Sequence, residues 1–214
     1  MKDISIYGAG GYGREVACLI HAINKVKKEW NFIGFFDDGL AVGHINEYGT
    51  NLGGITELNN FPYKLSVVMA IAHPMMALES IVKRITNPQI EFPNIIAPDI
   101  LYFDKNSMSI GHGNIVGFKS LISCNVQIGN FNRFNTSIFI GHDVNIGNFN
   151  MFNPATCISG EVKIGDSNFL GVGSIVLQQK QIGNYTTIGA NSVIMKKTKD
   201  NTTYIGNPAV ELKY

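Results

Sequence analysis

Charge of one sign, which would mark several classes of binding protein, is scarce in this sequence. Charged residues make up only 15% of the 214 residues, and the 17 Lys and Arg nearly balance the 16 Asp and Glu. A surface for nucleic acid or for an anionic membrane needs clustered Lys and Arg, and no such run is present. We therefore expect no nucleic-acid partner.

Cysteines and long apolar segments are also few. Cys18, Cys124 and Cys157 form no C-x-x-C pair and are odd in number, so the sequence indicates neither a disulfide framework nor a zinc ribbon. No run approaches the ~18 apolar residues of a membrane span, and glycines interrupt the N-terminal segment before a signal-peptide core can form. These absences predict a protein without a membrane span, in the reducing cytoplasm.

The first 95 residues alternate between strand-like and helix-like patterns. Short apolar runs occupy residues 4–7, 32–36 and 66–72, and apolar residues at helical spacing follow the first and the third run. This alternation predicts a parallel sheet with right-handed crossovers, and so a Rossmann-like domain over residues 1–95. The domain is too short for a full dinucleotide fold, which disfavours an NAD-dependent dehydrogenase and favours a nucleotide-sugar pocket.

A glycine motif lies between the first strand and its helix. Gly8, Gly10 and Gly13 form G-x-G-x-x-G, which lets a phosphate approach the backbone and meet the N–H groups that open a helix. The same glycines also suit any tight strand-to-helix turn. Asp37 and Asp38 follow the second strand, where a nucleotide-binding acid would lie, although acids of a surface turn fit equally well.

The second half of the chain is a repeat with a period of six. From Ile110 to Ile194 all fifteen positions on this period are Ile, Val, Leu or Phe, without an insertion. The next residue is Gly nine times and Asn or Ser four times, types that tolerate a sharp bend or a positive φ. The pattern resembles the hexapeptide repeat of the left-handed parallel β-helix, in which three six-residue faces form one triangular coil. It predicts an all-β domain over residues 96–214, including a C-terminal tail.

Stacked coils bring residues eighteen apart into inward columns. One column places Phe134 and Phe152 face to face inside the prism. Each coil then buries its apolar residues only against its neighbours, as solenoids do. The apolar residues on the six-residue period are therefore predicted to form the core and not a cofactor site.

The phase of the repeat predicts where the polar residues near its centre lie on the coil. His142 and Asp143 are the second and third residues after inward Ile140, so both side chains are expected to project outward. Gly160 lies one coil above His142 and should leave open space over the imidazole ring. Glu161 lies one coil above Asp143 and is expected to join the same polar patch.

A zinc site is not expected. His112 has the same phase as His142, but the thirty residues between them place it on a different face of the coil. The three-histidine arrangement of γ-carbonic anhydrases is therefore not supplied, and we predict no metal.

The combination of a short glycine-loop unit and an uninterrupted hexapeptide helix resembles one bacterial family. The family contains acetyl-CoA-dependent N-acetyltransferases of UDP-4-amino-sugars, perosamine-type N-acetyltransferases and sialic acid O-acetyltransferases. The resemblance runs from "YGAGGYG" through "FFDD" and "IGHDVNIG" to "YIGNPA". It implies a homotrimer, with acetyl-CoA bound between adjacent β-helices and a nucleotide-sugar held by the N-terminal domain.

The resemblance also implies roles for individual residues. The general base falls on His142, and the acid that raises its basicity falls on Asp143. Tyr12 and Met151 stand where some relatives have histidine, which for Met151 affects a side-chain contact but not a backbone contact. The implied nucleotide-sugar contacts are Gly10, Gly11, Tyr12, Asp37, Asp38 and Ala72, and the implied acetyl-CoA contacts are Met151, Val172 and Ala190.

The function implied is direct acetyl transfer from acetyl-CoA to the amino group of a nucleotide-linked amino-sugar, in surface-glycan biosynthesis. His142 would take the proton of the attacking amine, and Asp143 would stabilise the imidazolium and fix its tautomer. Two alternatives remain open. One is an O-acetyltransferase acting on a hydroxyl of a sialic acid or capsule unit. The other is a non-catalytic trimeric subunit that binds sugar nucleotides.

Overall fold

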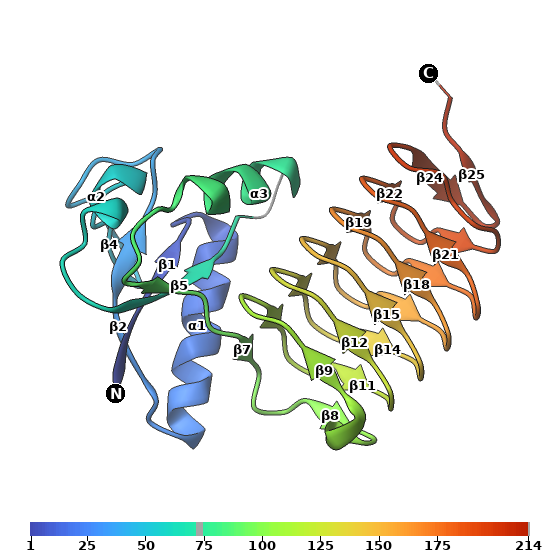
Figure 1. The fold of residues 1–214 in the computed structure, drawn as a ribbon, viewed down its shortest axis with the longest axis horizontal. Helices are drawn as coiled ribbons and strands as arrows, with labels where there is room; N and C mark the ends of the chain where they lie inside the picture. Colours follow the sequence, from blue (N-terminus) through green and yellow to red (C-terminus); the bar gives the residue numbers. More distant parts are fainter. Residues whose placement is uncertain (72–74, 214) are drawn as a thin grey trace. The chain divides into compact units, whose positions relative to one another are not determined.

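The computed structural model describes residues 1–71 and 75–213. The chain divides into two compact units, Met1–Pro98 and Asp99–Tyr214. Figure 1 shows an α/β first unit and a second unit wound as a parallel β-solenoid. None of the helices described is both long and apolar enough to cross a membrane.

A parallel four-stranded sheet forms the centre of the first unit, as predicted (Figure 1). Its order is β2-β1-β5-β6, and every neighbouring pair is parallel. The sequence did not predict the short elements that complete the unit. The bounds are β1 (Lys2–Tyr7), α1 (Gly11–Val26), β2 (Trp30–Phe36), β3 (Ile45–Asn46), β4 (Gly49–Thr50), α2 (Ile55–Asn59), β5 (Leu65–Met69), α3 (Met75–Arg84), β6 (Ile90–Glu91) and β7 (Ile95–Ile96).

Two glycines of the G-x-G-x-x-G motif are required by the fold itself. Gly8 has φ +107°, a conformation that L side chains rarely adopt. A Cβ at Gly13 would lie 1.9 Å from the carbonyl oxygen of Gly8, so α1 can approach the end of β1 only with glycine there. Gly10 and Gly11 have open space where a side chain would be, so their backbone is accessible.

The second unit is a left-handed parallel β-helix, and from β9 to β23 its strands pair with strands eighteen residues away. We name its three sheets by a central strand: the β14 sheet, the β15 sheet and the β16 sheet. The strands of the β14 sheet are β8 (Leu101–Tyr102), β11 (Leu121–Ile122), β14 (Phe139–Ile140), β17 (Cys157–Ile158), β20 (Ile175–Val176) and β23 (Val193–Ile194). Those of the β15 sheet are β9 (Ser109–Ile110), β12 (Gln127–Ile128), β15 (Asn145–Ile146), β18 (Lys163–Ile164) and β21 (Gln181–Ile182). The β16 sheet includes β10 (Ile115–Val116), β13 (Arg133–Phe134), β16 (Met151–Phe152), β19 (Phe169–Leu170), β22 (Thr187–Ile188), β24 (Thr203–Gly206) and the antiparallel β25 (Ala209–Glu211).

The predicted inward columns form the core of this unit. Fourteen of the fifteen positions are at most 5% exposed, and only Ile110, on the first coil, is half-buried. The rings of Phe134 and Phe152 stack with centroids 4.6 Å apart and an interplanar angle of 9°. The prediction that these two rings meet face to face is confirmed.

The positive φ predicted as one possible role of the recurrent glycines is not found at them. Positive φ occurs not at the residue after each inward position but two residues later, as at Asp143 with φ 58°. The glycines serve close stacking instead: a Cβ at Gly141 would lie 2.7 Å from the backbone nitrogen of Gly160. A side chain at Gly141 would therefore have to displace the neighbouring coil.

A buried ladder of asparagines fixes the register of the coils. Asn114, Asn132, Asn150 and Asn168 are completely buried and lie eighteen residues apart. The Oδ1 atom of each of the first three accepts hydrogen bonds from the backbone N–H and the amide group of the next asparagine. Burial without these bonds would be costly, so the ladder holds each coil directly above the one before it.

Candidate active site

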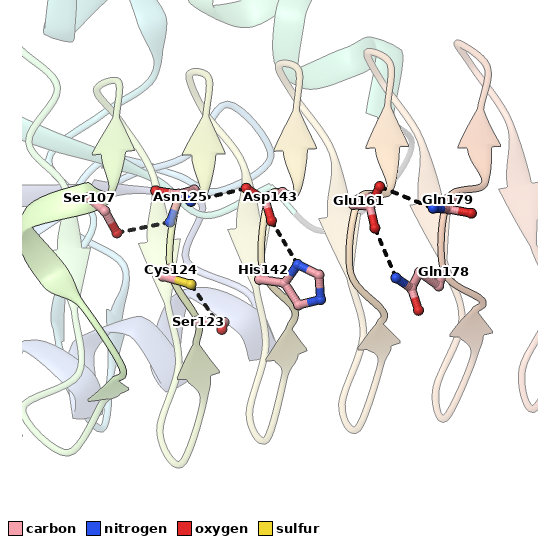
Figure 2. Close-up of polar contacts among 9 residues, drawn as sticks. All are labelled: Ser107, Ser123, Cys124, Asn125, His142, Asp143, Glu161, Gln178 and Gln179. Carbon is pink, nitrogen blue, oxygen red and sulfur yellow. Dashed lines mark hydrogen bonds and ion pairs between the residues drawn. The ribbon is translucent and has the colours of Figure 1, made fainter.

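His142 and Asp143 form a hydrogen-bonded pair at the corner between β14 and β15 (Figure 2). The side chains are 48% and 49% exposed, so both project outward as the phase of the repeat predicts. Asp143 Oδ2 lies 2.7 Å from His142 Nδ1. A carboxylate accepts the proton of Nδ1, and Nε2 is then the nitrogen that can take a proton from a substrate.

Gly160 lies directly against the imidazole ring of His142. A Cβ at position 160 would lie 2.5 Å from His142 Nε2 and 2.6 Å from Cε1. The ring therefore occupies the space that the sequence predicted to be open above it. Glycine at this position lets the imidazole extend over the next coil while Nδ1 stays bonded to Asp143.

The second oxygen of Asp143 is also held. Asn125, one coil below, donates from Nδ2 to Asp143 Oδ1 at 3.0 Å (Figure 2). The hydrogen bond to His142, followed by that from Asn125, lowers the pKa of the Asp143 carboxyl below its ordinary value. Hydrogen bonds to the charged form favour it, so Asp143 is a carboxylate at neutral pH.

Glu161 is held at the edge of this patch by two glutamines. Its carboxylate accepts from Gln178 Nε2 at 2.9 Å and from Gln179 Nε2 at 3.1 Å (Figure 2). These bonds lower the pKa of Glu161, while the negative charge of Asp143 acts in the opposite direction. Two carboxylates thus flank the corner that carries His142.

His112 does not take part in this site. It packs edge-on against Phe131, with ring centroids 5.1 Å apart. Within residues 1–71 and 75–213, no group of three or more His, Cys, Asp or Glu side chains could hold a metal ion.

The lowered pKa of Asp143 predicts how the pair responds to acid. A carboxyl whose pKa is depressed by folding contributes stability above its unfolded value of about 3.9, and that contribution is lost as pH falls through the lower folded value. We expect the Asp143 carboxyl to titrate below about 3.9 in a carbon-13 NMR titration of the folded protein. A midpoint at or above that value would contradict the geometry of the pair.

In the first unit, the residues of the glycine loop are accessible to a ligand. Gly10 and Gly11 are exposed, α1 begins at Gly11, and Tyr12 is half-buried. Asp37 braces this loop from the end of β2, because its Oδ2 accepts from the N–H of Ala9 at 2.8 Å. Ala72, the remaining predicted contact, lies outside the described residues.

Asp38 is engaged by the protein as well. The hydroxyl of Tyr7 and the N–H of Ile55, at the start of α2, donate to the two oxygens of its carboxylate. Partial burial acts to raise the pKa of Asp38, but these two hydrogen bonds outweigh it and the net shift is downward. Burial, followed by the bond to Asp38, raises the pKa of Tyr7. Both acids therefore accept hydrogen bonds from other parts of the first unit.

The three predicted acetyl-CoA contacts are not gathered around His142 within one chain. Val172 and Ala190 are exposed and stack one coil apart at the corner between the β16 and β14 sheets. His142 lies at the other corner, between the β14 and β15 sheets. Met151 is only 5% exposed, and its N–H already donates to Asn168 O at 2.8 Å.

Sequence reasoning missed Asn125, Gln178 and Gln179. The available signal was the coil spacing, because Asn125 lies eighteen residues before Asp143 and Gln179 eighteen residues after Glu161. Applying the spacing that located Gly160 to the residues before Asp143 would have found the amide that holds it.

Comparison with known proteins agrees with this fold. Residues 3–84 match the PglD N-terminal domain family. The acetyltransferase domain of PglB from Neisseria gonorrhoeae FA1090, in complex with acetyl coenzyme A, is 27% identical with a TM-score of 0.86, and the similarity covers 99% of both chains. WeeI from Acinetobacter baumannii AYE is 26% identical with a TM-score of 0.87, over 99% of this chain and all of that chain.

A third similar structure shows the same fold at lower identity. PerB from Caulobacter crescentus, in complex with CoA and GDP-perosamine, is 22% identical with a TM-score of 0.84, over 100% of this chain and 98% of that chain. A search of curated proteins finds no match.

Fold, repeat and near-complete structural similarity together define the class. The chain has the fold of hexapeptide-repeat acetyltransferases, a left-handed β-helix preceded by a Rossmann-like unit, and the similar structures include an acetyltransferase domain with acetyl coenzyme A. The resemblance drawn from "YGAGGYG" and "IGHDVNIG" is confirmed, and residues 3–84 place the N-terminal unit with the PglD N-terminal domains.

Proposed function

We propose that the protein transfers the acetyl group of acetyl-CoA to the amino group of a nucleotide-linked amino-sugar, in surface-glycan biosynthesis in the cytoplasm. The observation that carries this proposal is the outward His142–Asp143 pair, with Nδ1 occupied and Nε2 directed over Gly160. The similar structures with acetyl coenzyme A, or with CoA and GDP-perosamine, supply the chemical class of both substrates.

His142 acts as the general base in this proposal. Nε2 accepts a proton from the acceptor amine as its nitrogen forms a bond to the thioester carbonyl carbon. The carbon–sulfur bond then breaks, and His142 returns the proton to the departing CoA sulfur, so no covalent enzyme intermediate is needed. Asp143 stabilises the transient imidazolium and keeps Nδ1 protonated.

The glycine loop is the proposed site for the nucleotide. Gly10 and Gly11 offer open backbone at the start of the sixteen-residue helix α1, where N–H groups and the helix dipole favour a phosphate. Asp37 and Asp38 brace this region from the end of β2. Tyr12 and Ala72 complete the contacts that we propose for the nucleotide-sugar.

A homotrimer is proposed because, within one chain, the residues proposed to bind acetyl-CoA lie away from His142. Val172 and Ala190 lie across the β14 sheet from His142, so a second copy must bring its corner to that histidine. The outward column of the β14 sheet is apolar, unlike that of the β15 sheet, and suits burial against another chain. The outward column of the β14 sheet consists of Leu101, Leu121, Phe139, Cys157, Ile175 and Val193. That of the β15 sheet consists of Ser109, Gln127, Asn145, Lys163 and Gln181.

Phe139→Asp is expected to dissociate this trimer and abolish transfer, because burial of an unpaired charge in an apolar contact is strongly unfavourable. Phe139 is 39% exposed in the single chain, so the variant should still fold. Sedimentation should change from three times the chain mass of 23.4 kDa to a single chain. Gln127→Asp, on the β15 sheet, serves as the control and should remain trimeric. A monomeric wild-type protein, or a monomeric variant that remains active, would contradict the proposal that the active site is shared between chains.

Analysis of the product tests the function itself. Incubation with acetyl-CoA and an amino-sugar nucleotide should yield an acceptor that gains one acetyl group and keeps it in alkali, since an amide persists. An O-acetyl ester would be hydrolysed under the same conditions and would establish the alternative acceptor. Unmodified acceptors throughout, together with measurable binding, would identify a non-catalytic sugar-nucleotide-binding subunit.

A further inference from the structure

We infer that Asn125 is a positioning residue for the reaction, which holds the Asp143 carboxylate against Nδ1 of His142. This inference rests on the proposed role of His142 as general base. Asn125 donates from Nδ2 to Asp143 Oδ1 at 3.0 Å, while Asp143 Oδ2 lies 2.7 Å from the imidazole. The carboxylate therefore bridges the two side chains, one from each of two consecutive coils (Figure 2).

The exposure of the pair makes a second anchor necessary. Asp143 and His142 are each about half exposed, at 49% and 48%, and contacts between charged groups at such sites are weak because water competes for both partners. Asp143 alone could rotate its carboxylate into solvent. A hydrogen bond to the other oxygen restricts that rotation, so the population of the productive pair depends on Asn125.

Charge on the opposite side adds to this dependence. Glu161 lies one coil above Asp143, and the negative charge of Asp143 disfavours the charged form of Glu161. Each acid is bound by an amide from the coil away from its neighbour: Asn125 binds Asp143 from below, and Gln179 binds Glu161 from above. The two amides thus oppose any rotation that brings the carboxylates together, and they keep both acids ionised.

Asn125 is itself fixed in place. Its backbone N–H donates to Ser107 Oγ at 2.9 Å, and that hydroxyl donates to Asp104 O at 3.0 Å in the 3₁₀ turn η1 (Lys105–Ser107). Its φ of 56° lies in the left-handed region, where asparagine is among the most tolerated non-glycine residues. Three successive coils therefore support the orientation of one imidazole ring.

Asn125→Gly is the sharpest test, because it removes the amide while easing the left-handed φ. We expect kcat to fall about tenfold with KM for acetyl-CoA unchanged, as for other residues that orient a catalytic group. The pKa of the Asp143 carboxyl should rise toward its ordinary value in a carbon-13 NMR titration. Asn201→Gly is the matched control. Asn201 is also exposed and has φ 54°, but it lies at the C-terminal end of the β-helix, in a different coil from His142.

A second variant guards against loss of folding. Asn125→Asp retains size and tolerance of the left-handed region but replaces the donor by a third carboxylate, and it should lower kcat and raise the Asp143 pKa. An unchanged kcat in Asn125→Gly, or a lowered kcat without a shift in the Asp143 titration, would overturn the inference. The titration requires no acceptor, so a wild-type protein without transferase activity would refute the proposed function separately from this contact.

Discussion

His142→Ala is expected to lower kcat by about 10²–10⁴-fold and to leave KM for acetyl-CoA little changed, because general-base catalysis contributes in this range. The side chain is half exposed, so the free energy of unfolding should stay close to that of the wild type. Steady-state release of CoA thiol, with acceptor and donor both saturating, measures the effect.

A second variant, Asp143→Asn, tests the same pair from its other side chain. It keeps a side chain of similar size but can present an amide donor to Nδ1, which favours the wrong tautomer. A loss in both variants, with acetyl-CoA binding intact, supports the base assignment. Activity of His142→Ala within about threefold of the wild type would remove His142 from the mechanism, because such a difference is far below a general-base contribution.

Gly160→Ala is expected to lower kcat about 10²-fold, the typical cost of displacing a catalytic group by roughly 1 Å. The added Cβ would lie 2.5 Å from His142 Nε2, so the ring must leave its place over the next coil. Gly160 has no positive φ, so alanine fits its backbone and the fold should be retained. A crystal structure or NMR spectrum of the variant should show the imidazole displaced.

A double-mutant cycle separates this effect from general damage. In a His142→Ala background, Gly160→Ala should cost nothing further, because the methyl group then has no ring to displace. Additive losses would mean that Gly160 acts on the substrate or on the coil and not through His142.

The β-helix was predictable because its signal is repeated. Fifteen consecutive sixth positions carry apolar residues, and each coil buries them in the same way, so one phase places every column, including Phe134 against Phe152. The same phase oriented His142 and Asp143 outward and put Gly160 next to the ring.

The details that the phase did not give depend on the third dimension of the stack. The residue with positive φ is at the Asp143 position and not at the Gly141 position. Glycine is needed at position 141 because the next coil passes close to it, and this contact is seen only when the coils are stacked. Asn125 was not predicted as part of the site because a single surface asparagine carries no sequence pattern that indicates a function. Its role arises from the carboxylate eighteen residues later.

The acids after β2 show a different limit. Their place at the carboxyl end of a strand suits nucleotide binding, and the sequence could not tell that Ala9, Tyr7 and Ile55 donate to them. Hydrogen bonds from short elements such as α2, which carry no periodic pattern, are outside the reach of sequence reasoning.

Release of CoA thiol from acetyl-CoA, measured against UDP-, GDP-, dTDP- and CMP-linked amino-sugars and their hydroxy counterparts, tests the central claim most directly. We expect the wild-type protein to release thiol in step with acetylation of at least one amino-sugar nucleotide, and His142→Ala to lose that release. Absence of thiol release with every acceptor, or equal release by His142→Ala, would contradict the account.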